Sequence, residues 1–303
     1  MAETNANPVA SLLSGEIAER IKQLELFSRL RVEGARSGEN RSPRIGFSSD
    51  FRQHRQYFPG DSLRYLDWRV LARTDRLVVK QYEELTNAEM VVLLDISGSM
   101  AFAGAGMSKL EFGVRCAGIL TYLMYVQRDS YSLQLFGESA EDSIPRGEGR
   151  RHQRRVFEKL VSAVARGPTR FVECFRQVEA RRRRKGLVIV LSDFMAEPEP
   201  IAKALGRLRM RGHDVIAFQV FDAAERDLDF VDFTRFRDLE DGEVLGADPL
   251  LIQAEYRRQF DRHQLRIKEQ CLAHAVDHVV LPVADEYDEV IGDYLRRRAA
   301  LIS

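Results

Sequence analysis

The hydrophobic pattern divides the chain into an irregular first part and a regularly alternating second part. From residue 89 onward, short runs of consecutive apolar residues alternate with longer segments in which apolar residues recur at helical spacing. A continuous apolar run suits a strand that is buried on both faces, as in a parallel sheet covered by helices. Runs of this kind at residues 90–96 and 187–191 predict two strands, and further strands are predicted at 131–136, 214–221 and 277–283.

The segments between these strands favour helices, and one segment favours a hairpin. A long helix is expected from Pro249 to about residue 275, because Asp248 is a good N-cap and proline suits the first turn. The dipeptide Asp241-Gly242 indicates a hairpin over residues 235–244. Alternating strands and helices predict an α/β fold with a doubly wound, mostly parallel sheet and helices on both faces. Helical spacing predicts the other helices at residues 109–126, 156–164, 171–183, 201–211 and 287–301.

The first part of the chain has a different character. Residues 9–35 have helical spacing and predict a lead-in helix, whereas residues 36–48 are rich in Gly, Ser, Asn and Arg and favour a loop. Residues 49–87 combine a short β-like segment at 76–82 with a Pro59-Gly60 turn. We therefore expect an N-terminal helix and loop (1–44), a small β-rich attachment (45–87) and the α/β domain (88–303).

Composition adds limits to this picture. The 303 residues include 46 basic and 46 acidic side chains, so the chain has no net charge to attract nucleic acid or anionic lipid. Cys116, Cys174 and Cys271 are sparse and widely separated, which argues against a disulfide scaffold and suits a reducing compartment. The sequence has no signal-peptide pattern and no apolar run that could span a bilayer. These features predict a cytoplasmic protein without a membrane span.

Three segments can deliver oxygen ligands to one edge of the predicted sheet. Asp95, Ser97 and Ser99 follow the first buried strand, Thr169 comes just before a helix, and Asp193 follows the strand at 187–191. In sheets of this kind, ligands bind beyond the carboxyl ends of the strands. A site with oxygen donors and without His or Cys suits a hard cation and leaves coordination positions for water or a guest.

Each segment also has a simpler structural interpretation. Asp95, Ser97 and Ser99 could form only a turn and a helix N-cap, Thr169 could cap the helix that follows it, and Asp193 could stabilise a turn. Single short motifs are weak indicators. The joint occurrence of the three segments, in this order and on these elements, favours a metal site.

These five residues resemble the metal-ion-dependent adhesion site of von Willebrand factor A domains. The resemblance implies that the hydroxyls of Ser97, Ser99 and Thr169 contact Mg²⁺ directly or through water, with Asp95 and Asp193 in supporting roles. Mn²⁺ and Ca²⁺ are the alternative ions. It also implies a free coordination position that an acidic side chain of a client protein would fill.

A second resemblance covers the segment before the α/β domain. The segment is similar to the signature of domain-of-unknown-function family 58, whose members commonly pair with MoxR-type AAA+ ATPases. The resemblance implies such an ATPase as partner. The signature itself could pack the attachment onto the main domain or recognise the ATPase, and its composition of turn formers, paired charges and one Trp favours packing. The matching residues are Phe51, Arg55, Tyr57, Pro59, Gly60, Asp61, Arg64, Asp67, Trp68, Ala72 and Arg73.

Other classes of function are less well supported. Basic runs at 146–155 and 181–185 lack interleaved aromatic residues, which favours solvated faces or protein contacts over nucleic acid. Asp95 at a strand end is also the layout of haloacid dehalogenase-type phosphatases, but Ser97 stands where those enzymes have a second Asp, and no obvious Lys completes the set. We expect a non-enzymatic, Mg²⁺-dependent protein-binding module that acts as an adaptor or co-chaperone. A phosphatase and a purely structural scaffold are the alternatives.

Overall fold

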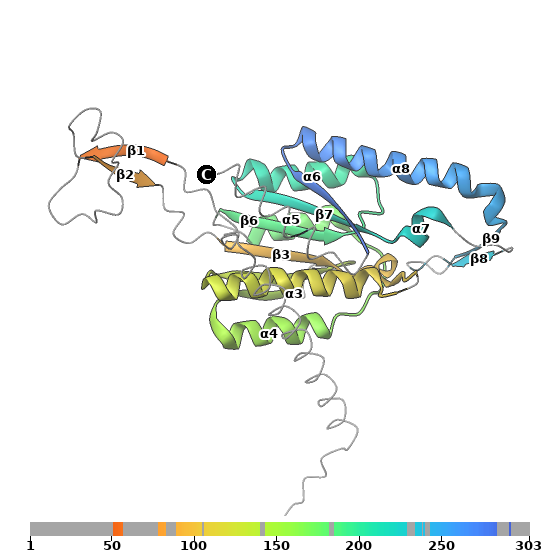
Figure 1. Ribbon diagram of the computed structural model, residues 1–303, viewed down its shortest axis with the longest axis horizontal. Coiled ribbons are helices and arrows are strands. Elements are labelled where there is room, and N and C mark those ends of the chain that lie inside the picture. Colours follow the sequence, from red (N-terminus) through yellow and green to blue (C-terminus); the bar gives the residue numbers. More distant parts are fainter. Residues whose placement is uncertain are drawn as a thin grey trace, which may run out of the picture.

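The fold is built on a six-stranded sheet, seen in a computed structural model of the protein (Figure 1). The structure describes residues 51–56, 78–82, 89–104, 106–139, 143–181, 185–228, 234–237, 239, 243–283 and 291. The strand order is β10-β7-β6-β3-β4-β5, and all neighbours are parallel except the antiparallel pair β4 and β5. The strands are β3 (Glu89–Asp95), β4 (Tyr131–Phe136), β5 (Ser143–Gly147), β6 (Gly186–Ser192), β7 (Asp214–Phe221) and β10 (Asp277–Pro282).

The central strand β3 shows why these apolar runs become buried strands. All seven residues of β3 are buried, and successive side chains point to opposite faces of the sheet. Val91 and Leu93 belong to the core cluster on one face, whereas Val92 and Leu94 belong to the cluster on the other. Each face therefore needs a helical layer, and the continuous apolar run is the sequence pattern that this requires.

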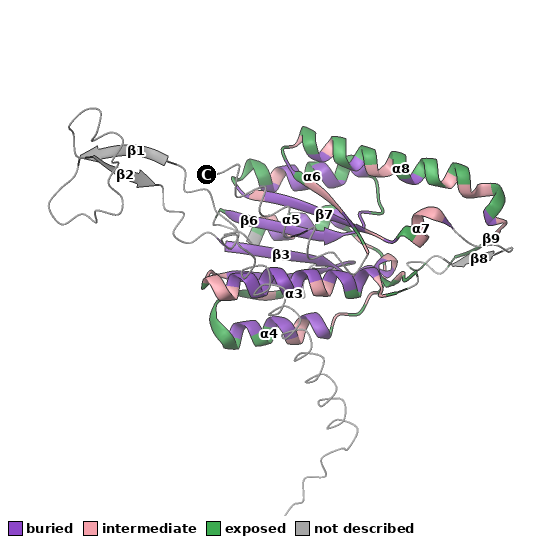
Figure 2. Cartoon of the chain, viewed as in Figure 1, coloured by how far each residue is buried: buried purple, intermediate pink, exposed green. Residues whose placement is uncertain are grey.

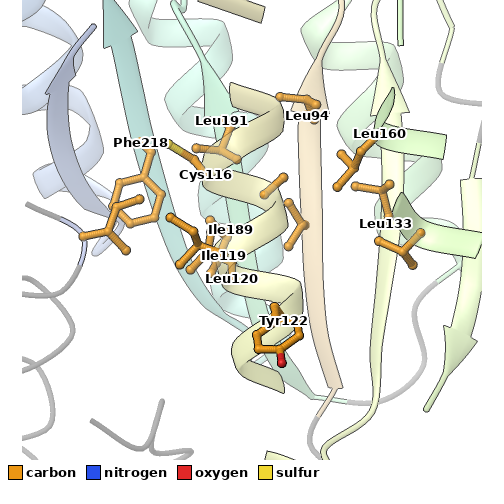
Figure 3. Packing of buried hydrophobic residues seen from close by; sticks show 14 of the residues in the cluster. Leu94, Cys116, Ile119, Leu120, Tyr122, Leu133, Leu160, Ile189, Leu191 and Phe218 are labelled. Atoms are coloured by element: carbon orange, nitrogen blue, oxygen red, sulfur yellow. The ribbon is translucent and has the colours of Figure 1, made fainter. Parts of the chain in front are cut away.

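Helices cover both faces of the sheet (Figures 1 and 2). On one face, α3 (Lys109–Gln127) lies against the sheet with α4 (Gly149–Val161) beside it. Figure 3 shows Cys116, Ile119 and Leu120 of α3 packed over Ile189 and Leu191 of β6. The other face is covered by α5 (Phe171–Arg181), α6 (Pro198–Met210) and α8 (Pro249–Ala273).

Local capping fixes where two of these helices begin. The Ser108 hydroxyl accepts a hydrogen bond from the amide of Glu111 at 3.1 Å, which places the start of α3 directly after the loop that follows β3. Asp248 accepts from the amide of Leu250 at 3.0 Å, and Pro249 occupies the first turn of α8. The expected α8 start is thus confirmed.

The α/β prediction is confirmed, with three elements added. The bounds of β4 and β7 coincide with the predicted runs, but β5, the short helix α7 (Ala223–Asp227) and the 3₁₀ helix η2 (Gly98–Ala101) were not expected. The strand β5 contains Pro145, which is tolerated because β5 is an edge strand. Helix α4 begins seven residues before the predicted start, since its first two turns are mostly Arg, His and Gln and show little apolar periodicity.

Two small antiparallel pairs lie outside the main sheet. Strand β1 (Phe51–Gln56) pairs with β2 (Val78–Tyr82), and β8 (Thr234–Arg237) pairs with β9 (Val244–Ala247) in the expected hairpin. The predicted helix at 9–35, the loop at 36–48 and every signature residue after Gln56 lie outside the described residues, as does the predicted helix at 287–301 except for residue 291, which is helical. The division of the chain into three parts stays a prediction.

Two absences apply to the described part of the chain. None of its helices combines the length and apolar character that crossing a bilayer requires. Cys116, Cys174 and Cys271 are all buried, and none of them forms a disulfide.

Candidate metal centre

Asp95 lies at the carboxyl end of β3 and forms the floor of the candidate site. Its side chain is fully buried, and both of its oxygens accept hydrogen bonds. The Oδ1 atom accepts from the amide of Ser97 at 2.9 Å and from the Thr169 hydroxyl at 3.1 Å. The Oδ2 atom accepts from the Ser192 hydroxyl at 2.6 Å. One carboxylate thus connects the ends of β3 and β6 with the loop before α5.

The two serine hydroxyls lie next to each other above this floor. The Oγ atoms of Ser97 and Ser99 are 3.1 Å apart. Ser97 precedes η2, yet its hydroxyl makes no capping hydrogen bond to that helix. The Asp95 to Ser97 turn of the simpler interpretation is present, whereas the Ser97 hydroxyl does not supply its helix cap. The paired hydroxyls offer two oxygen donors on the same side of the site.

Backbone hydrogen bonds hold the Thr169 loop against the serine loop. The amide of Arg166 donates to the carbonyl of Ile96 at 2.8 Å, and the amide of Gly98 donates to the carbonyl of Gly167 at 2.7 Å. Gly167 has a φ of +64°, a conformation that glycine adopts without strain. These two bonds explain how segments about 70 residues apart bring Thr169 to Asp95.

Asp193 is held by a buried lysine that the sequence analysis did not identify. Its Oδ1 atom accepts from the amide of Met195 at 3.2 Å, which is the expected turn interaction, while Oδ2 accepts from Lys109 Nζ at 2.8 Å. The Lys109 ammonium also donates to both carboxylate oxygens of Glu225, each at 2.9 Å. The side chains of Lys109 and Asp193 are 0% and 3% exposed, and that of Glu225 is 15% exposed.

The charges shift each other's protonation in the directions expected from burial and proximity. Burial raises the pKa of Asp95 to about 7, and the negative charge of Asp193 adds to the rise against the hydrogen bonds from Ser192 and Ser97. Burial alone would lower the pKa of Lys109, but Asp193 and Glu225 raise it above its ordinary value. Lys109 is therefore a fixed positive charge, whereas Asp95 has no positively charged partner among the described residues.

A second set of contacts joins α7 to the same loops. Asp222 accepts from the amide of Ala224 at 2.8 Å and so caps α7, and its other oxygen accepts from the amide of Gly104 at 2.9 Å. A side chain at position 104 would come within 2.6 Å of the Asp222 carboxylate, so this approach requires glycine. Through Asp222 and Glu225, α7 is attached to both the loop after β3 and the start of α3.

The structure thus gathers Asp95, Ser97, Ser99 and Thr169 through direct hydrogen bonds, and it places Asp193 close enough to raise the pKa of Asp95. Among the described residues, no three His, Cys, Asp or Glu side chains gather as a metal cluster by themselves. Any cation here would depend on the hydroxyls. A donor set of hydroxyl and carboxylate oxygens fits a hard cation such as Mg²⁺.

Sequence reasoning missed four polar residues of this region. One signal for Lys109 was available: a positive charge in the first turn of a helix is unfavourable, so a lysine there needs nearby carboxylates. No comparable local signal distinguishes the others. The missed residues are Lys109, Ser192, Asp222 and Glu225.

Comparison with known proteins assigns the family. The chain belongs to the family described as protein of unknown function DUF58, which matches residues 53–270. An uncharacterised protein of Mycobacterium tuberculosis is 28% identical over 267 residues, which cover 83% of each chain. The expected family membership is confirmed, while the association with a MoxR-type ATPase stays a prediction.

Solved structures with a similar fold have low sequence identity. An aerotolerance-related membrane protein from Bacteroides fragilis is 15% identical, with a TM-score of 0.48, and the match covers 71% of this chain and 99% of that one. The SpRpn10 VWA domain is 9% identical, with a TM-score of 0.38, and the match covers 67% and 93% of the two chains.

The predicted cytoplasmic location is corrected by these comparisons. It is contradicted because the similar solved structures include proteins named as membrane proteins. The prediction rested on the lack of a signal peptide and of long apolar segments. Those features bear only on whether the chain itself crosses a bilayer, and they do not determine where the protein works.

The buried lysine generates a stability prediction. Replacing it in Lys109→Met leaves the carboxylates of Asp193 and Glu225 without their positive partner, so the free energy of unfolding should fall by about 3–5 kcal/mol. Urea unfolding followed by circular dichroism measures the loss. The control is Lys203→Met, which removes an exposed ion pair with Glu199 and should change stability little. Equal effects of the two variants would contradict the structural role assigned to Lys109.

Proposed function

We propose that this protein is a non-enzymatic binding module that holds Mg²⁺ at Asp95, Ser97, Ser99, Thr169 and Asp193. The bound cation would in turn accept an acidic side chain of a partner protein. The observation that supports this most strongly is the excess of buried negative charge around Asp95. Family membership and fold agree with a protein-interaction module.

The charge excess follows from the ion pairs. When ionised, the buried carboxylates of Asp95 and Asp193 and the 15%-exposed carboxylate of Glu225 bring three negative charges to this region, and Lys109 brings one positive charge. No other Lys or Arg of the described residues pairs with these carboxylates. A deficit of two positive charges is costly in a buried site, because charges removed from water need partners. A divalent cation supplies that charge, and without one a proton on Asp95 relieves part of the deficit.

The exposure of the donors leaves room for a guest ligand. Asp95 and Ser97 are buried, whereas Ser99 and Thr169 are partly exposed. A cation held from the inside by these oxygens would face the solvent on its outer side. Because hard cations take six or more oxygen ligands, a carboxylate from another protein could complete the coordination.

We further propose that the partner is a MoxR-type AAA+ ATPase, which the protein assists in remodelling or maturing a client. The support for this partner is the resemblance of the N-terminal signature to the family's pattern. The metal site would then recognise an acidic residue of the ATPase or of its client.

One observation in the structure favours the phosphatase alternative. From the sequence, no lysine was expected to complete such a site, but Lys109 lies beside Asp193 and donates a hydrogen bond to it. However, the nucleophile would be Asp95, whose side chain is fully enclosed with both oxygens already hydrogen-bonded. We therefore favour binding. Hydrolysis of p-nitrophenyl phosphate in Mg²⁺ that disappears in Asp95→Asn would establish the enzyme instead.

Cation binding should appear as a gain in stability. At free Mg²⁺ roughly ten times its dissociation constant, the native protein should gain about 1.4 kcal/mol. In Asp95→Asn the gain should vanish, because the amide removes one of the charges that attract the ion. Thermal unfolding across a Mg²⁺ titration measures both effects. The control Asp261→Asn, on the exposed side of α8, should keep the full gain, and an equal gain in all three proteins would rule out this site.

Partner binding is tested with the whole chain as bait. In Mg²⁺, the wild-type protein should retain the MoxR-type ATPase of the same cell, identified by mass spectrometry. Chelation alone is a poor control, since the ATPase itself uses Mg²⁺ with its nucleotide. The decisive bait is therefore Ser97→Ala with Ser99→Ala, kept in Mg²⁺, which should lose the ATPase. Undiminished retention by a bait with a lowered melting temperature would favour the purely structural scaffold.

A further inference from the structure

A groove lies beside the candidate metal centre, between the loop after β6 and helix α8. Its volume is about 310 Å³. Met195 stands at the β6 side of the groove with 43% of its side chain exposed, and Tyr256 and Phe260 of α8 supply aromatic surface. Its basic side chains are Arg262, His263 and Arg266. The groove therefore combines apolar walls with positive charge.

The groove and the metal centre share the same short segment of chain. The amide of Met195 donates to the Asp193 carboxylate at 3.2 Å, so the groove begins two residues from a proposed ligand. The ring of His263 is 2.9 Å from the carbonyl of Phe194, which ties α8 to that segment. On the far side, burial raises the pKa of Tyr256, and the nearby charge of Glu225 adds to the rise. The β6 side of the groove therefore adjoins Asp193, and Tyr256 on the α8 side lies near the charge of Glu225.

The positive charge of the groove is largely uncompensated. Arg262 hydrogen-bonds to the neutral side chain of Gln259 at 3.4 Å, and neither Arg262 nor Arg266 forms an ion pair with any described residue. By contrast, Arg257 and Arg258 of the same helix each pair with a carboxylate. Of the residues that the structure describes, Glu197 is the single acidic one that lines the groove. A carboxylate ligand would be the complementary guest, because guanidinium groups bind carboxylates through paired, charge-assisted hydrogen bonds.

We infer that this groove is a second contact for the partner protein and binds a second carboxylate of the same acidic segment whose first carboxylate reaches the cation. The inference rests on the proposed function. The volume suits one or two side chains, and the apolar walls would pack against the methylene groups of an Asp or Glu and its neighbours. Two weak contacts on one segment reinforce each other, since the second forms at high effective concentration. The partner is thus a protein with two closely spaced acidic residues.

Three kinds of fluorescein-labelled peptide test the inference by fluorescence anisotropy in Mg²⁺. The first has a single Asp among Gly and Ser residues, the second is a series with another Asp placed at increasing separation, and the third replaces that second Asp by Leu. The best two-acid peptide should bind about tenfold more tightly than the single-acid peptide. Arg262→Gln with Arg266→Gln should abolish this gain and leave single-acid binding unchanged. Arg258→Gln, outside the groove on the same helix, should retain the gain.

The outcomes separate the groove from the metal site. If single-acid binding depends on Mg²⁺ but the second Asp adds nothing, or Leu serves equally well, the groove inference is overturned and the proposed function stands. If single-acid binding survives both EDTA and Asp95→Asn, or is undetectable in Mg²⁺, the proposed function fails, and with it the link between groove and cation. Loss of the gain in Arg258→Gln as well would show a general charge effect and overturn the groove.

Discussion

A carboxylate that is buried without a positive partner destabilises a folded protein, and strand β3 ends in such a carboxylate, Asp95. Asp95 is enclosed by the sheet edge and receives hydrogen bonds from three segments, but no lysine or arginine of the described residues reaches it. Lys109 lies close by, yet it is occupied by Asp193 and Glu225. We propose that the site takes up a cation, which would supply the positive charge that Asp95 lacks.

The parallel sheet explains why carboxylates gather at this edge of the sheet. Strands β3 and β6 are adjacent and parallel, so their carboxyl ends bring Asp95 and Asp193 to the same edge. The loop before α5 is joined to the same edge by backbone hydrogen bonds at Ile96 and Gly98. Helix α7 adds Glu225 from the end of β7. This topology therefore brings oxygen atoms from segments far apart in sequence to the same edge of the sheet.

Most positions of β4 and β7 are apolar because both faces of these strands are covered, and their polar residues Ser132, Gln134 and Gln219 are buried as well. The sequence therefore predicted these two strands with the observed bounds. It missed β5, which has Pro145 and lies at the edge, and α7, whose five residues are too few to show periodicity. Short elements of this kind are fixed by tertiary contacts, such as the bond from Gly104 to Asp222.

The oxygens of the candidate site were predicted from the sequence, but its counter-charge was not. The spacing of Asp95, Ser97 and Ser99 after a buried run indicated the position of the site, whereas Lys109 was predicted only as part of the helix at 109–126. A fully buried lysine is rare, and only the folded chain shows the carboxylates that hold it. The groove between Met195 and α8 was not predicted from the sequence either, because residues about 60 positions apart in sequence form it.

The central claim is that a divalent cation occupies the position between Asp95 and the two serine hydroxyls. Anomalous diffraction from crystals soaked in excess Mn²⁺ tests it most directly, since the ion is located without reference to any activity. We predict an anomalous peak within roughly 2.0–2.6 Å of the hydroxyl oxygens of Ser97 and Ser99, the range in which hard cations bind oxygen. A map without a peak at these oxygens, with the Lys109 ammonium still the only cation bonded to Asp193, would contradict the account.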